Sequence, residues 1–392
     1  MTRPFRLAIV AGEASGDALA IRFVAALREQ LGERELVMAG VGGQGLIDAG
    51  LSPLFPQVDI AVMGFGPVIA RLPLLLRRIE DAARGVAAFA PDLLLTIDAP
   101  DFSLRVAKKL RRRAPSIPIV HWVCPSVWAW RSGRAKRMAP HVDRILALLP
   151  FEPAALARLH GPETVYVGHP LMERLGDMRP NAIEAARRAD ADNPLVLLLP
   201  GSRRSEINHL LPVFGDAIAR VASALPGARF VLPAVPHLAA LIGDMTAQWP
   251  VRPEIVMGEA AKLAAFRSAR GALAASGTVT LELALAQVPT VAAYRGASWE
   301  AALARRLIKL PSVILPNLIL GRSVVPEFIQ DSATADPLAS HLVAALAEGA
   351  ARESQLAGFA EVETIMAAAG PSPAAKAVAE ALAVLRDRPD ES

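Results

Sequence analysis

The chain has 392 residues, of which 53% are hydrophobic, 20% charged and 5% aromatic, and its mean hydropathy is +0.35. This composition excludes a disordered chain and a small disulfide-stapled scaffold, and the length suggests two or three domains. The net charge of +4 is uneven: residues 1–172 carry 21 basic and 15 acidic side chains, and the remainder carries 21 and 23. The longest stretch without formal charge, residues 114–130, contains three prolines and does not predict a membrane-spanning helix.

Cysteine and histidine usage bears on compartment and metals. A single cysteine, Cys124, allows no intrachain disulfide and gives no sign of an oxidising compartment. The apolar run 7–12 is short for a signal peptide and lacks a cleavage site, so it predicts a buried strand in a cytoplasmic protein. The seven histidines show no metal-ligand spacing, and His169 alone is interpreted as structural, so we expect no metal site and no metal cofactor.

Strand-like and helix-like segments alternate along the chain. The first half predicts helices at 18–30 and 104–113, and strands at 7–12, 92–98, 117–123 and 144–149. After the polar stretch 179–193, strands are predicted at 195–199, 229–233, 252–256, 271–275 and 290–293. Apolar runs without alternation suit parallel strands covered on both faces. The pattern predicts an α/β fold with two Rossmann-like doubly wound domains, residues 1–172 and 173–336, and a helical tail, 337–392, for which packing back on the first domain stays open.

The first candidate ligand loop is AGEASGD, residues 11–17, between a predicted strand and a predicted helix. Its glycines allow tight turning, and N–H groups at a helix start favour an anion, but it is not the GxGxxG of dinucleotide-binding folds. Two interpretations stay open. Either Ser15 or Asp17 caps an ordinary βα turn, or Glu13, Ser15, Gly16 and Asp17 contact a ligand.

Two carboxylates, Asp98 and Asp101, stand in TIDAPDF, residues 96–102, at the carboxyl end of a predicted buried strand. Ligands of open α/β sheets bind at that edge, and a carboxylate there can act as a general base. In the alternative, Asp101 caps the next helix and Asp98 binds loop amides, which explains one aspartate more easily than both.

Residues 121–138, HWVCPSVWAWRSGRAKRM, place Trp128 and Trp130 beside Arg131 and further basic residues. A surface of tryptophan and arginine suits sugar stacking, phosphate or lipid headgroups. No nucleic-acid-binding module is recognisable, so no nucleic acid partner is expected. The alternative is a proline-rich loop whose tryptophans fill the core.

The segment LLLPGSRRSEI, residues 197–207, predicts a strand followed by a phosphate-binding turn. Gly201 allows close approach, Ser202 can cap the following helix, and Arg203 can bind a diphosphate. The turn lacks a P-loop lysine, which argues against NTP hydrolysis. In the alternative, it is a capped helix start with a solvated arginine.

A second turn of this kind lies in ALAASGTVTLELAL, residues 272–285. Ser276, Gly277 and Thr278 form a small-residue turn, and Glu282 follows one helical turn later. A glutamate at that place can accept hydrogen bonds from ribose hydroxyls. In the alternative, Glu282 faces solvent, which two such turns in one domain make less attractive.

The order of the short motifs resembles one family over about residues 7–328. The motifs are AGEASGD, AVMG (61–64), IDAPDF (97–102), PSVWAWR (125–131), LPFE (149–152), GHP (168–170), LLPGSR (198–203), ASGT (275–278), LPN (315–317) and GR (321–322). Together they resemble lipid-A-disaccharide synthases, which are glycosyltransferases of the GT-B type (family 19). The resemblance implies two Rossmann-like domains facing a cleft.

The resemblance also implies an inverting hexosyltransferase that transfers 2,3-diacylglucosamine from UDP to 2,3-diacylglucosamine 1-phosphate (lipid X), giving lipid A disaccharide 1-phosphate and UDP. Asp98 matches the base of the family. Its UDP-holding residues match the turns of Gly201, Ser202 and Arg203 and of Ser276, Gly277, Thr278 and Glu282, and Asn317 and Arg322 match a loop near the nucleotide. No cofactor or metal is implied, and a homodimer with exchanged C-terminal segments stays open.

Other interpretations of the same residues are another UDP-sugar GT-B glycosyltransferase, a UDP-sugar epimerase, or a nucleotide-binding module that docks on membranes without catalysis. Two basic apolar segments, 60–84 and 299–310, bear on the membrane question. For 60–84 we expect a peripheral contact with the cytoplasmic face of the inner membrane, because both implied substrates carry acyl chains. For 299–310 we expect a helix packed on the core.

Overall fold

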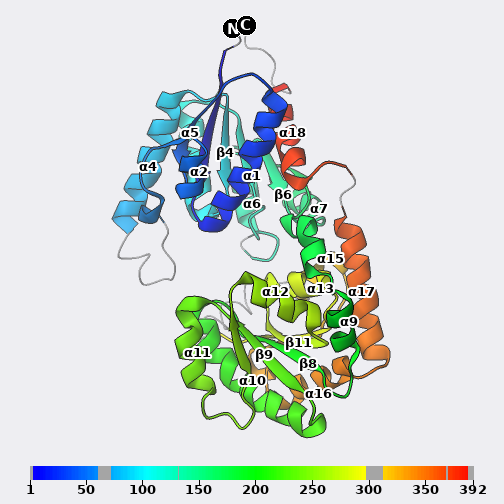
Figure 1. Cartoon of the computed structure of the whole chain (residues 1–392). Coiled ribbons are helices and arrows are strands. Elements are labelled where there is room, and N and C mark those ends of the chain that lie inside the picture. The colour runs from blue at the N-terminus through cyan, green and yellow to red at the C-terminus, as the bar shows by residue number, and fades with distance from the viewer. Residues whose placement is uncertain (1–2, 61–71, 131, 297–311, 368–369, 387–392) are drawn as a thin grey trace. The chain divides into compact units, whose positions relative to one another are not determined.

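The computed structural model describes residues 3–60, 72–130, 132–296, 312–367 and 370–386. The chain divides into two compact units (Figure 1). Unit 1 comprises residues 1–169 and 368–392, and unit 2 comprises residues 170–367.

Unit 1 is built on a seven-stranded parallel sheet with the strand order β3-β2-β1-β4-β5-β6-β7. Its strands are β1 (Phe5–Ala11), β2 (Leu36–Val41), β3 (Leu51–Pro53), β4 (Leu93–Ile97), β5 (Ile119–Trp122), β6 (Arg144–Ala147) and β7 (Glu163–Tyr166). In β1 the side chains of Leu7 and Ile9 join one apolar cluster, and those of Ala8 and Val10 join another. Both faces of the sheet are therefore buried, as its unbroken apolar runs require.

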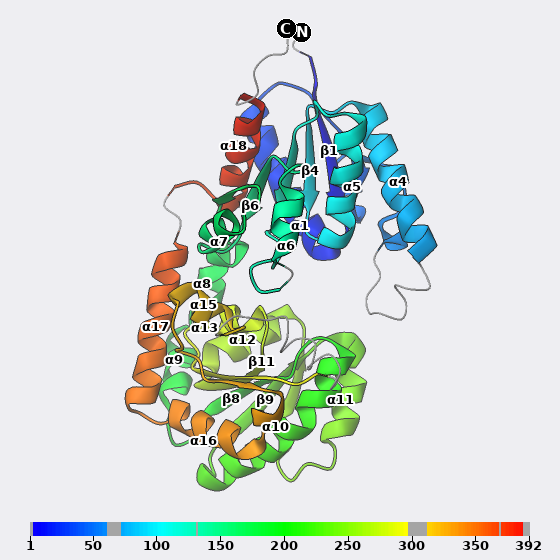
Figure 2. The same ribbon diagram turned by 180° about the vertical axis from the view of Figure 1, so that it is seen from behind.

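Helices cover the two faces of this sheet (Figures 1 and 2). They are α1 (Ala14–Leu31), α2 (Gln44–Asp48), α4 (Leu72–Phe89), α5 (Pro100–Arg113), α6 (Gly133–Met138), α7 (Glu152–Arg158) and α18 (Pro373–Arg386), with a 3-10 turn η1 (Gln57–Asp59). Helices α1 and α18 contribute to one cluster, and α4, α5 and α6 contribute to the other. The helix nearest the C-terminus is thus part of unit 1.

Unit 2 is built on a six-stranded parallel sheet with the strand order β10-β9-β8-β11-β12-β13. Its strands are β8 (Leu195–Leu199), β9 (Arg229–Ala234), β10 (Glu254–Met257), β11 (Gly271–Ala275), β12 (Thr290–Tyr294) and β13 (Glu327–Ile329). The order reverses direction at β8 and β11. The loops after these two strands leave the sheet at the place where ligands of open α/β sheets bind.

The helices of unit 2 are α8 (Leu175–Met178), α9 (Ala182–Ala189), α10 (Arg204–Ala224), α11 (Ala239–Thr246), α12 (Glu259–Ser268), α13 (Val279–Leu285), α15 (Leu315–Leu320), α16 (Ala335–Leu346) and α17 (Ala350–Met366), with 3-10 turns η2 (Pro170–Arg174), η3 (Pro236–Leu238) and η4 (Gln330–Ser332). Helices α10, α11 and α16 share one apolar cluster with the sheet. The polar stretch 179–193 holds α9, whose start is fixed by a capping box between Asn181 and Glu184.

The predicted fold class is confirmed: both units are α/β with parallel sheets and helices on the faces. The boundary lies between His169 and Pro170, three residues before the expected one. The expected tail 337–392 is divided, because α16 and α17 pack in unit 2, whereas Ala377 and Ala381 of α18 pack in unit 1. No helix of the described ranges combines the length and apolarity needed to cross a membrane.

Candidate functional site

A pocket of about 570 Å³ opens at the carboxyl ends of four parallel strands of unit 2. Leu199, Ala234, Val256 and Ala275, at or next to the ends of β8, β9, β10 and β11, line it. Parallel strands deliver their following loops to one edge, so turns that lie far apart in sequence meet there. The predicted residues that line this pocket are Gly201, Ser202, Arg203, Ser276, Gly277, Thr278 and Glu282. The structure therefore brings both phosphate-type turns together.

The turn after β8 is held by a glutamate that the sequence analysis did not single out. Glu206 Oε2 accepts hydrogen bonds from the backbone N–H groups of Ser202 (2.9 Å) and Arg203 (3.1 Å). Gly201 has φ +113°, and a Cβ there would lie 2.3 Å from Glu206 Oε2. Because Glu206 already uses these two N–H groups, the group left exposed for an anion is the Arg203 guanidinium, whose side chain is 73% exposed. A glutamate three residues after a helix N-cap is a capping-box signal that could have revealed Glu206.

The turn after β11 contains a buried hydroxyl that is unsatisfied. Ser276 Oγ is buried and has no hydrogen-bond partner within the described ranges, while the Ser276 N–H donates to the carbonyl of Ala293 (2.8 Å). A buried polar group without a partner is costly and is rare in a folded chain. Because Ser276 lines the pocket, a ligand that supplies a hydrogen bond there would remove this cost.

Glu282 and Lys262 form an ion pair within the pocket. Lys262 Nζ lies 2.5 Å from Glu282 Oε2, and both side chains are about three-quarters buried. Lys262 comes from α12 and Glu282 from α13, so the interpretation in which Glu282 simply faces solvent is wrong. The same helix α12 supplies Glu259, whose pKa is held below its usual value chiefly by a hydrogen bond from Arg174. Lys262 and Glu259 carry no local sequence signal, because their partners lie outside α12.

Asn317 and Arg322 are not brought to this pocket. Asn317 is buried, and its Oδ1 accepts hydrogen bonds from the backbone N–H groups of Val324 (2.8 Å) and Val325 (2.9 Å). Arg322 Nη1 lies 3.0 Å from Glu361 Oε1 on α17. Neither residue lines the pocket, so in this structure Asn317 fixes a loop and Arg322 ties that loop to a helix.

Unit 1 gathers strained backbone at the carboxyl ends of β4 and β5. Asp98, Ala99 and Val123 have φ values of +48°, +43° and +77°, a region that residues with a Cβ rarely adopt. Each such residue costs on the order of 1–3 kcal/mol and persists where its surroundings fix it, often at functional sites. The Asp98 N–H donates to the carbonyl of Trp122 (3.0 Å), which fixes where the chain leaves the sheet.

The two aspartates of this loop differ in their surroundings. Asp98 is half-buried, and the described part of the chain provides its carboxylate with no hydrogen-bond donor and no cation. Asp101 lies 3.0 Å from Arg134 Nη1, and α5 begins at Pro100 with Ala99 at its N-cap. Helix capping by Asp101 is therefore wrong, and Asp98 is the aspartate of this loop whose carboxylate has no ion pair within the described ranges.

The loop of residues 11–17 lies beside the Asp98 loop. A Cβ on Gly12 would lie 2.6 Å from the Ala99 Cβ, so these two turns touch. Gly16 faces β4, and a Cβ on it would lie 3.4 Å from the Ile97 carbonyl oxygen. The glycines thus serve the close approach of two loops at the sheet edge.

Among the polar residues of that loop, Asp17 holds the loop in place, whereas Glu13 and Ser15 lie at the surface. Glu13 is the N-cap of α1 and makes no side-chain capping bond, so capping by Ser15 or Asp17 is wrong. Asp17 Oδ1 accepts a hydrogen bond from the Gly43 N–H (2.6 Å), which ties the loop to the segment after β2. Glu13 and Ser15 are exposed.

The two tryptophans of the PSVWAWR segment have different environments. Trp128 Nε1 donates to Glu152 Oε1 (3.2 Å), and its ring packs edge-to-face on Phe151 at 4.9 Å. Trp128 therefore has the core position that the alternative interpretation proposed. Trp130 is 41% exposed. Arg131 lies outside the described residues.

Glu152 is a buried carboxyl in a place with little compensating charge. Burial raises its pKa to about 7, although hydrogen bonds from the Leu149 N–H and from Trp128 oppose the shift. His169, the last residue before the boundary, is partly buried, and the loss of hydration lowers its pKa to about 4. Both groups titrate far from their ordinary values because the charged form loses hydration.

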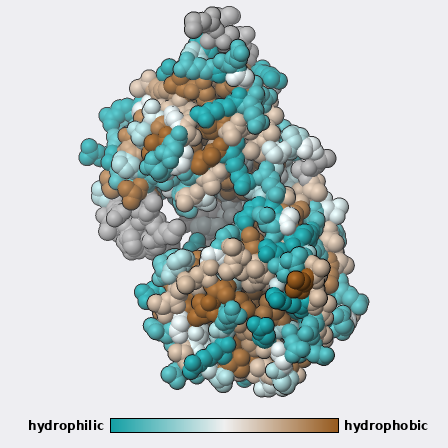
Figure 3. Space-filling view, viewed as in Figure 1, coloured by the Kyte–Doolittle hydropathy of each residue, from teal (hydrophilic) through white to brown (hydrophobic). Residues whose placement is uncertain are grey.

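Part of the expected membrane segment is described. Residues 61–71 and 299–310 lie outside the described residues, so the expected membrane contact can be compared with the structure only at α4. Ile79 and Val86 of α4 are buried, whereas Leu72 and Leu76 are 44% and 47% exposed. Apolar surface is visible over the end of α4 where the helix begins (Figure 3).

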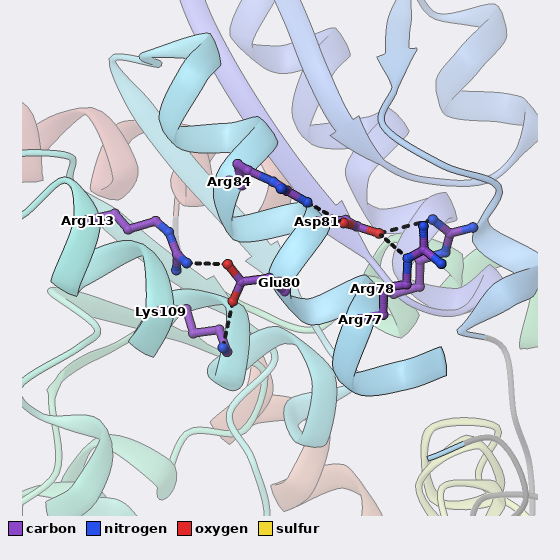
Figure 4. Close-up of polar contacts among 7 residues, drawn as sticks. All are labelled: Arg77, Arg78, Glu80, Asp81, Arg84, Lys109 and Arg113. Carbon is purple, nitrogen blue, oxygen red and sulfur yellow. Dashed lines mark hydrogen bonds and ion pairs between the residues drawn. The ribbon is translucent and has the colours of Figure 1, made fainter. Parts of the chain in front are cut away.

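Ion pairs link α4 to α5 on their polar sides (Figure 4). Asp81 pairs with Arg78 (3.2 Å) and Arg84 (2.7 Å) along α4. Glu80 pairs with Lys109 (2.7 Å) and Arg113 on α5. Both basic side chains of this face of α5 are thus paired with a carboxylate of the unit, which they share.

Comparison with known proteins places these features in a family. Residues 7–378 match the family model described as Lipid-A-disaccharide synthetase. The chain belongs to this family. A lipid-A-disaccharide synthase of Nitrobacter winogradskyi is 50% identical over 98% of this chain and 97% of the relative, and one of Rhodopseudomonas palustris (strain HaA2) is 48% identical over 97% and 96%. The family makes this chain a hexosyltransferase of lipid A synthesis.

Solved structures with the same fold are more distant. A UDP-GlcNAc 2-epimerase of Neisseria meningitidis bound to UDP-GlcNAc aligns with a TM-score of 0.56 at 12% identity, covering 97% of this chain and all of that one. MurG of Acinetobacter baumannii also gives a TM-score of 0.56 at 12% identity, covering 96% and 99%. At such identities these structures show the fold alone, which is the GT-B fold with two Rossmann-like units.

Within the described ranges, no group of three or more His, Cys, Asp or Glu side chains could hold a metal ion. The cations that line the pocket are instead Arg203 and Lys262. A guanidinium and an ammonium can both bind phosphate oxygens. The pocket therefore has groups for an anionic diphosphate and carboxylates for hydroxyl donors.

Proposed function

We propose that this glycosyltransferase transfers 2,3-diacylglucosamine from UDP-2,3-diacylglucosamine to 2,3-diacylglucosamine 1-phosphate, forming the β-1,6-linked disaccharide 1-phosphate and UDP. The observation that carries the proposal is the unit 2 pocket, where Arg203, Ser276 and Glu282 meet in a chain of the lipid-A-disaccharide synthetase family. An exposed guanidinium, an unsatisfied hydroxyl and a carboxylate match the diphosphate and ribose of a UDP-sugar.

In the proposed reaction, Asp98 is the general base. It takes the proton of the acceptor's 6-hydroxyl as that oxygen attacks the anomeric carbon, and the bond from that carbon to the UDP oxygen breaks with inversion. The open carboxylate and the strained backbone of Asp98 support this role. Arg203 stabilises the negative charge that develops on the leaving diphosphate. Glu282 accepts hydrogen bonds from the ribose, and Lys262 holds Glu282 in place.

The proposed location is the cytoplasmic face of the inner membrane. The exposed Leu72 and Leu76 and the 77% exposed Arg77 give the start of α4 an apolar and basic surface, which suits an interface with anionic lipid. Both proposed substrates carry acyl chains, so docking there would give the enzyme access to them.

The test is an assay of the purified chain with UDP-2,3-diacylglucosamine and lipid X, scoring both disaccharide and UDP. We expect both products in equal amounts, and neither when the acylated donor is replaced by UDP-N-acetylglucosamine. Turnover of UDP-N-acetylglucosamine without any acylated substrate would contradict the proposal and favour an epimerase or another glycosyltransferase. UDP binding without turnover of any donor would favour a nucleotide-binding module.

A further inference from the structure

A second cavity lies entirely within unit 1, between α5 and the α6 region, and has a volume of about 450 Å³. We call it the α5–α6 groove. Its charged lining consists of Asp101, Arg105 and Lys108 from α5, Arg134 and Arg137 from α6, and His141 just after α6. The spacing of four and three residues along α5 puts its three members on one face of that helix. Its volume falls in the range of about 300–1,000 Å³ that is typical of small-molecule sites.

The basic side chains on the two sides of α5 differ in their ion pairing. On the side facing α4, Lys109 and Arg113 are both paired with Glu80 (Figure 4). On the groove side, Arg105 and Lys108 make no ion pair within the described ranges. On one face of α5 the two cations therefore share the carboxylate of Glu80, whereas on the groove face neither Arg105 nor Lys108 has an ion-pair partner within the described ranges.

The α6 side of the groove adds to this excess. Arg137 Nε donates only to the carbonyl of Gly133 (3.2 Å), which leaves its charge uncompensated. Arg134 pairs with Asp101 and also donates to the Pro100 carbonyl (2.6 Å). Four cations thus face one carboxylate around a single cavity. The ordinary explanation of exposed lysine and arginine is a solvated surface, but these side chains converge on a cavity from two helices.

The pKa of His141, which lines the groove, reflects the positive charge around it. The pKa of His141 is held below its usual value, first by burial and then by repulsion from Lys108, with Arg112 and Arg111 contributing. The cations around His141 thus disfavour a further positive charge at this place. An anion in the groove would relieve this repulsion.

The groove also lies close to the loop that carries Asp98. Asp101 lines it and follows Asp98 by three residues, so the groove begins where α5 leaves the carboxyl edge of the sheet. We propose that the α5–α6 groove binds a phosphate monoester, held by Arg105, Lys108 and Arg137. This proposal rests on the proposed function in one respect, since it identifies the monoester as the 1-phosphate of the acceptor. A monoester carries about −1.5 to −2 charges at pH 7, which several converging cations can hold through charge-assisted hydrogen bonds.

The test measures binding without turnover, so that it is independent of the proposed reaction. The full chain is titrated with glucosamine 1-phosphate and followed by ³¹P line broadening, with neutral glucosamine followed by ¹H saturation transfer as the uncharged probe. The groove variant is Lys108→Gln with Arg137→Gln. The matched control is Lys136→Gln with Arg158→Gln, which removes the same charges from exposed positions of α6 and α7 that do not line the groove. Arg105→Gln alone serves as a second groove variant.

We expect the parent and the control to bind glucosamine 1-phosphate equally and glucosamine not at all. Both groove variants should bind the phosphate at least tenfold more weakly. Equal binding by the groove variants and the control would overturn the proposal. So would a loss of binding in Arg203→Ala alone, because the phosphate would then occupy the unit 2 pocket.

A membrane phospholipid is the competing source of phosphate, and vesicles of phosphatidylglycerol distinguish it. If the groove variants lose vesicle binding but keep glucosamine 1-phosphate, the groove is a lipid contact and the proposal is wrong. If the parent binds the monoester through the groove but forms no disaccharide with lipid X, the groove stands as a phosphate site and the proposed function fails.

Discussion

The unit 2 pocket and the α5–α6 groove of unit 1 are both lined by cations, but their charge balance differs. In the pocket, Arg203 lies beside Glu206 and Lys262 beside Glu282, so each cation has a carboxylate within 3.4 Å. In the groove, four cations share one carboxylate. A site with both signs can bind a ligand that has both anionic groups and hydroxyls, whereas a site with one sign selects an anion. Under the two proposals, the two substrates are recognised by different electrostatics in different units.

The largest expected effect is on Asp98, which belongs to neither site. Asp98→Asn removes the proposed base and should lower kcat by about 10²- to 10⁴-fold. The affinity for UDP should not change, because the pocket lies in the other unit. Steady-state rates with both substrates and calorimetric titration with UDP measure the two quantities. A variant with the parent's kcat would show that another group takes the proton.

The next effect concerns Glu152, a carboxyl that lacks the cation partner found in the pocket. Its pKa is about 7 in the folded chain against 4.5 for an ordinary glutamate, because burial disfavours the charge. The folded state therefore holds this proton more tightly, and the stability it confers is present at pH 4.5 and below and is lost as pH rises to about 7. This shift corresponds to about 3 kcal/mol of unfolding free energy.

Glu152→Gln should consequently gain stability relative to the parent as pH rises from 5 to 8. Urea unfolding at the two pH values measures the difference, and Glu33→Gln, at an exposed position of unit 1, is the control. Equal pH dependence of the parent and Glu152→Gln would mean that the pKa of Glu152 is not raised in the folded chain.

Arg203 tests the cation of the unit 2 pocket that is proposed to bind the diphosphate. Arg203→Ala removes an exposed guanidinium and should weaken UDP binding by about 10- to 100-fold, the range for a hydrogen bond to a charged group. Arg204→Ala is the matched control, because Arg204 is the next residue, is exposed and does not line the pocket. Calorimetry with UDP distinguishes them. Equal losses in both variants would indicate a general field effect and no specific contact.

The smallest effect is expected for the face of α5 whose cations pair with Glu80. Glu80→Gln breaks the pairs with Lys109 and Arg113, but such exposed pairs contribute little and are screened by salt. The Lys109 hydrogen bond and the nearby cations lower the pKa of Glu80, so its small contribution is present at neutral pH and is lost on acidification. We expect a slight fall in melting temperature at low salt that disappears at high salt. A large fall would mean that this face of α5 is essential to the unit.

The sequence predicted the parts of the fold in which local pattern and burial agree. The runs 195–199 and 271–275 coincide with β8 and β11, because apolar residues buried on both faces leave an unbroken signal. Four strands were missed: β2, β3, β7 and β13. β3 and β13 have three residues each and lie at sheet edges, so they leave no such run. The sequence also left undecided whether α18 packs in unit 1, because an alanine-rich helix face can pack against many apolar surfaces.

The candidate site divides in the same way. Arg203 and Ser276 were found because they follow buried strands, and the carboxyl ends of parallel strands meet at one edge. Lys262 was missed because it is linked to the pocket by its ion pair with Glu282, which lies twenty residues away on another helix. Asn317 was selected because the LPN motif resembles the family, but its amide oxygen fixes a loop, which only three-dimensional contacts reveal.

The most direct test of the central claim is one matrix of initial rates, with the UDP-sugar and the sugar 1-phosphate acceptor both varied. The parent is compared with Arg203→Ala and with Lys108→Gln/Arg137→Gln. We predict that Arg203→Ala raises the KM of the UDP-sugar alone and that the groove variant raises the KM of the acceptor alone. If either variant raises both KM values equally, or if the two effects are exchanged, the two units do not divide the substrates as proposed.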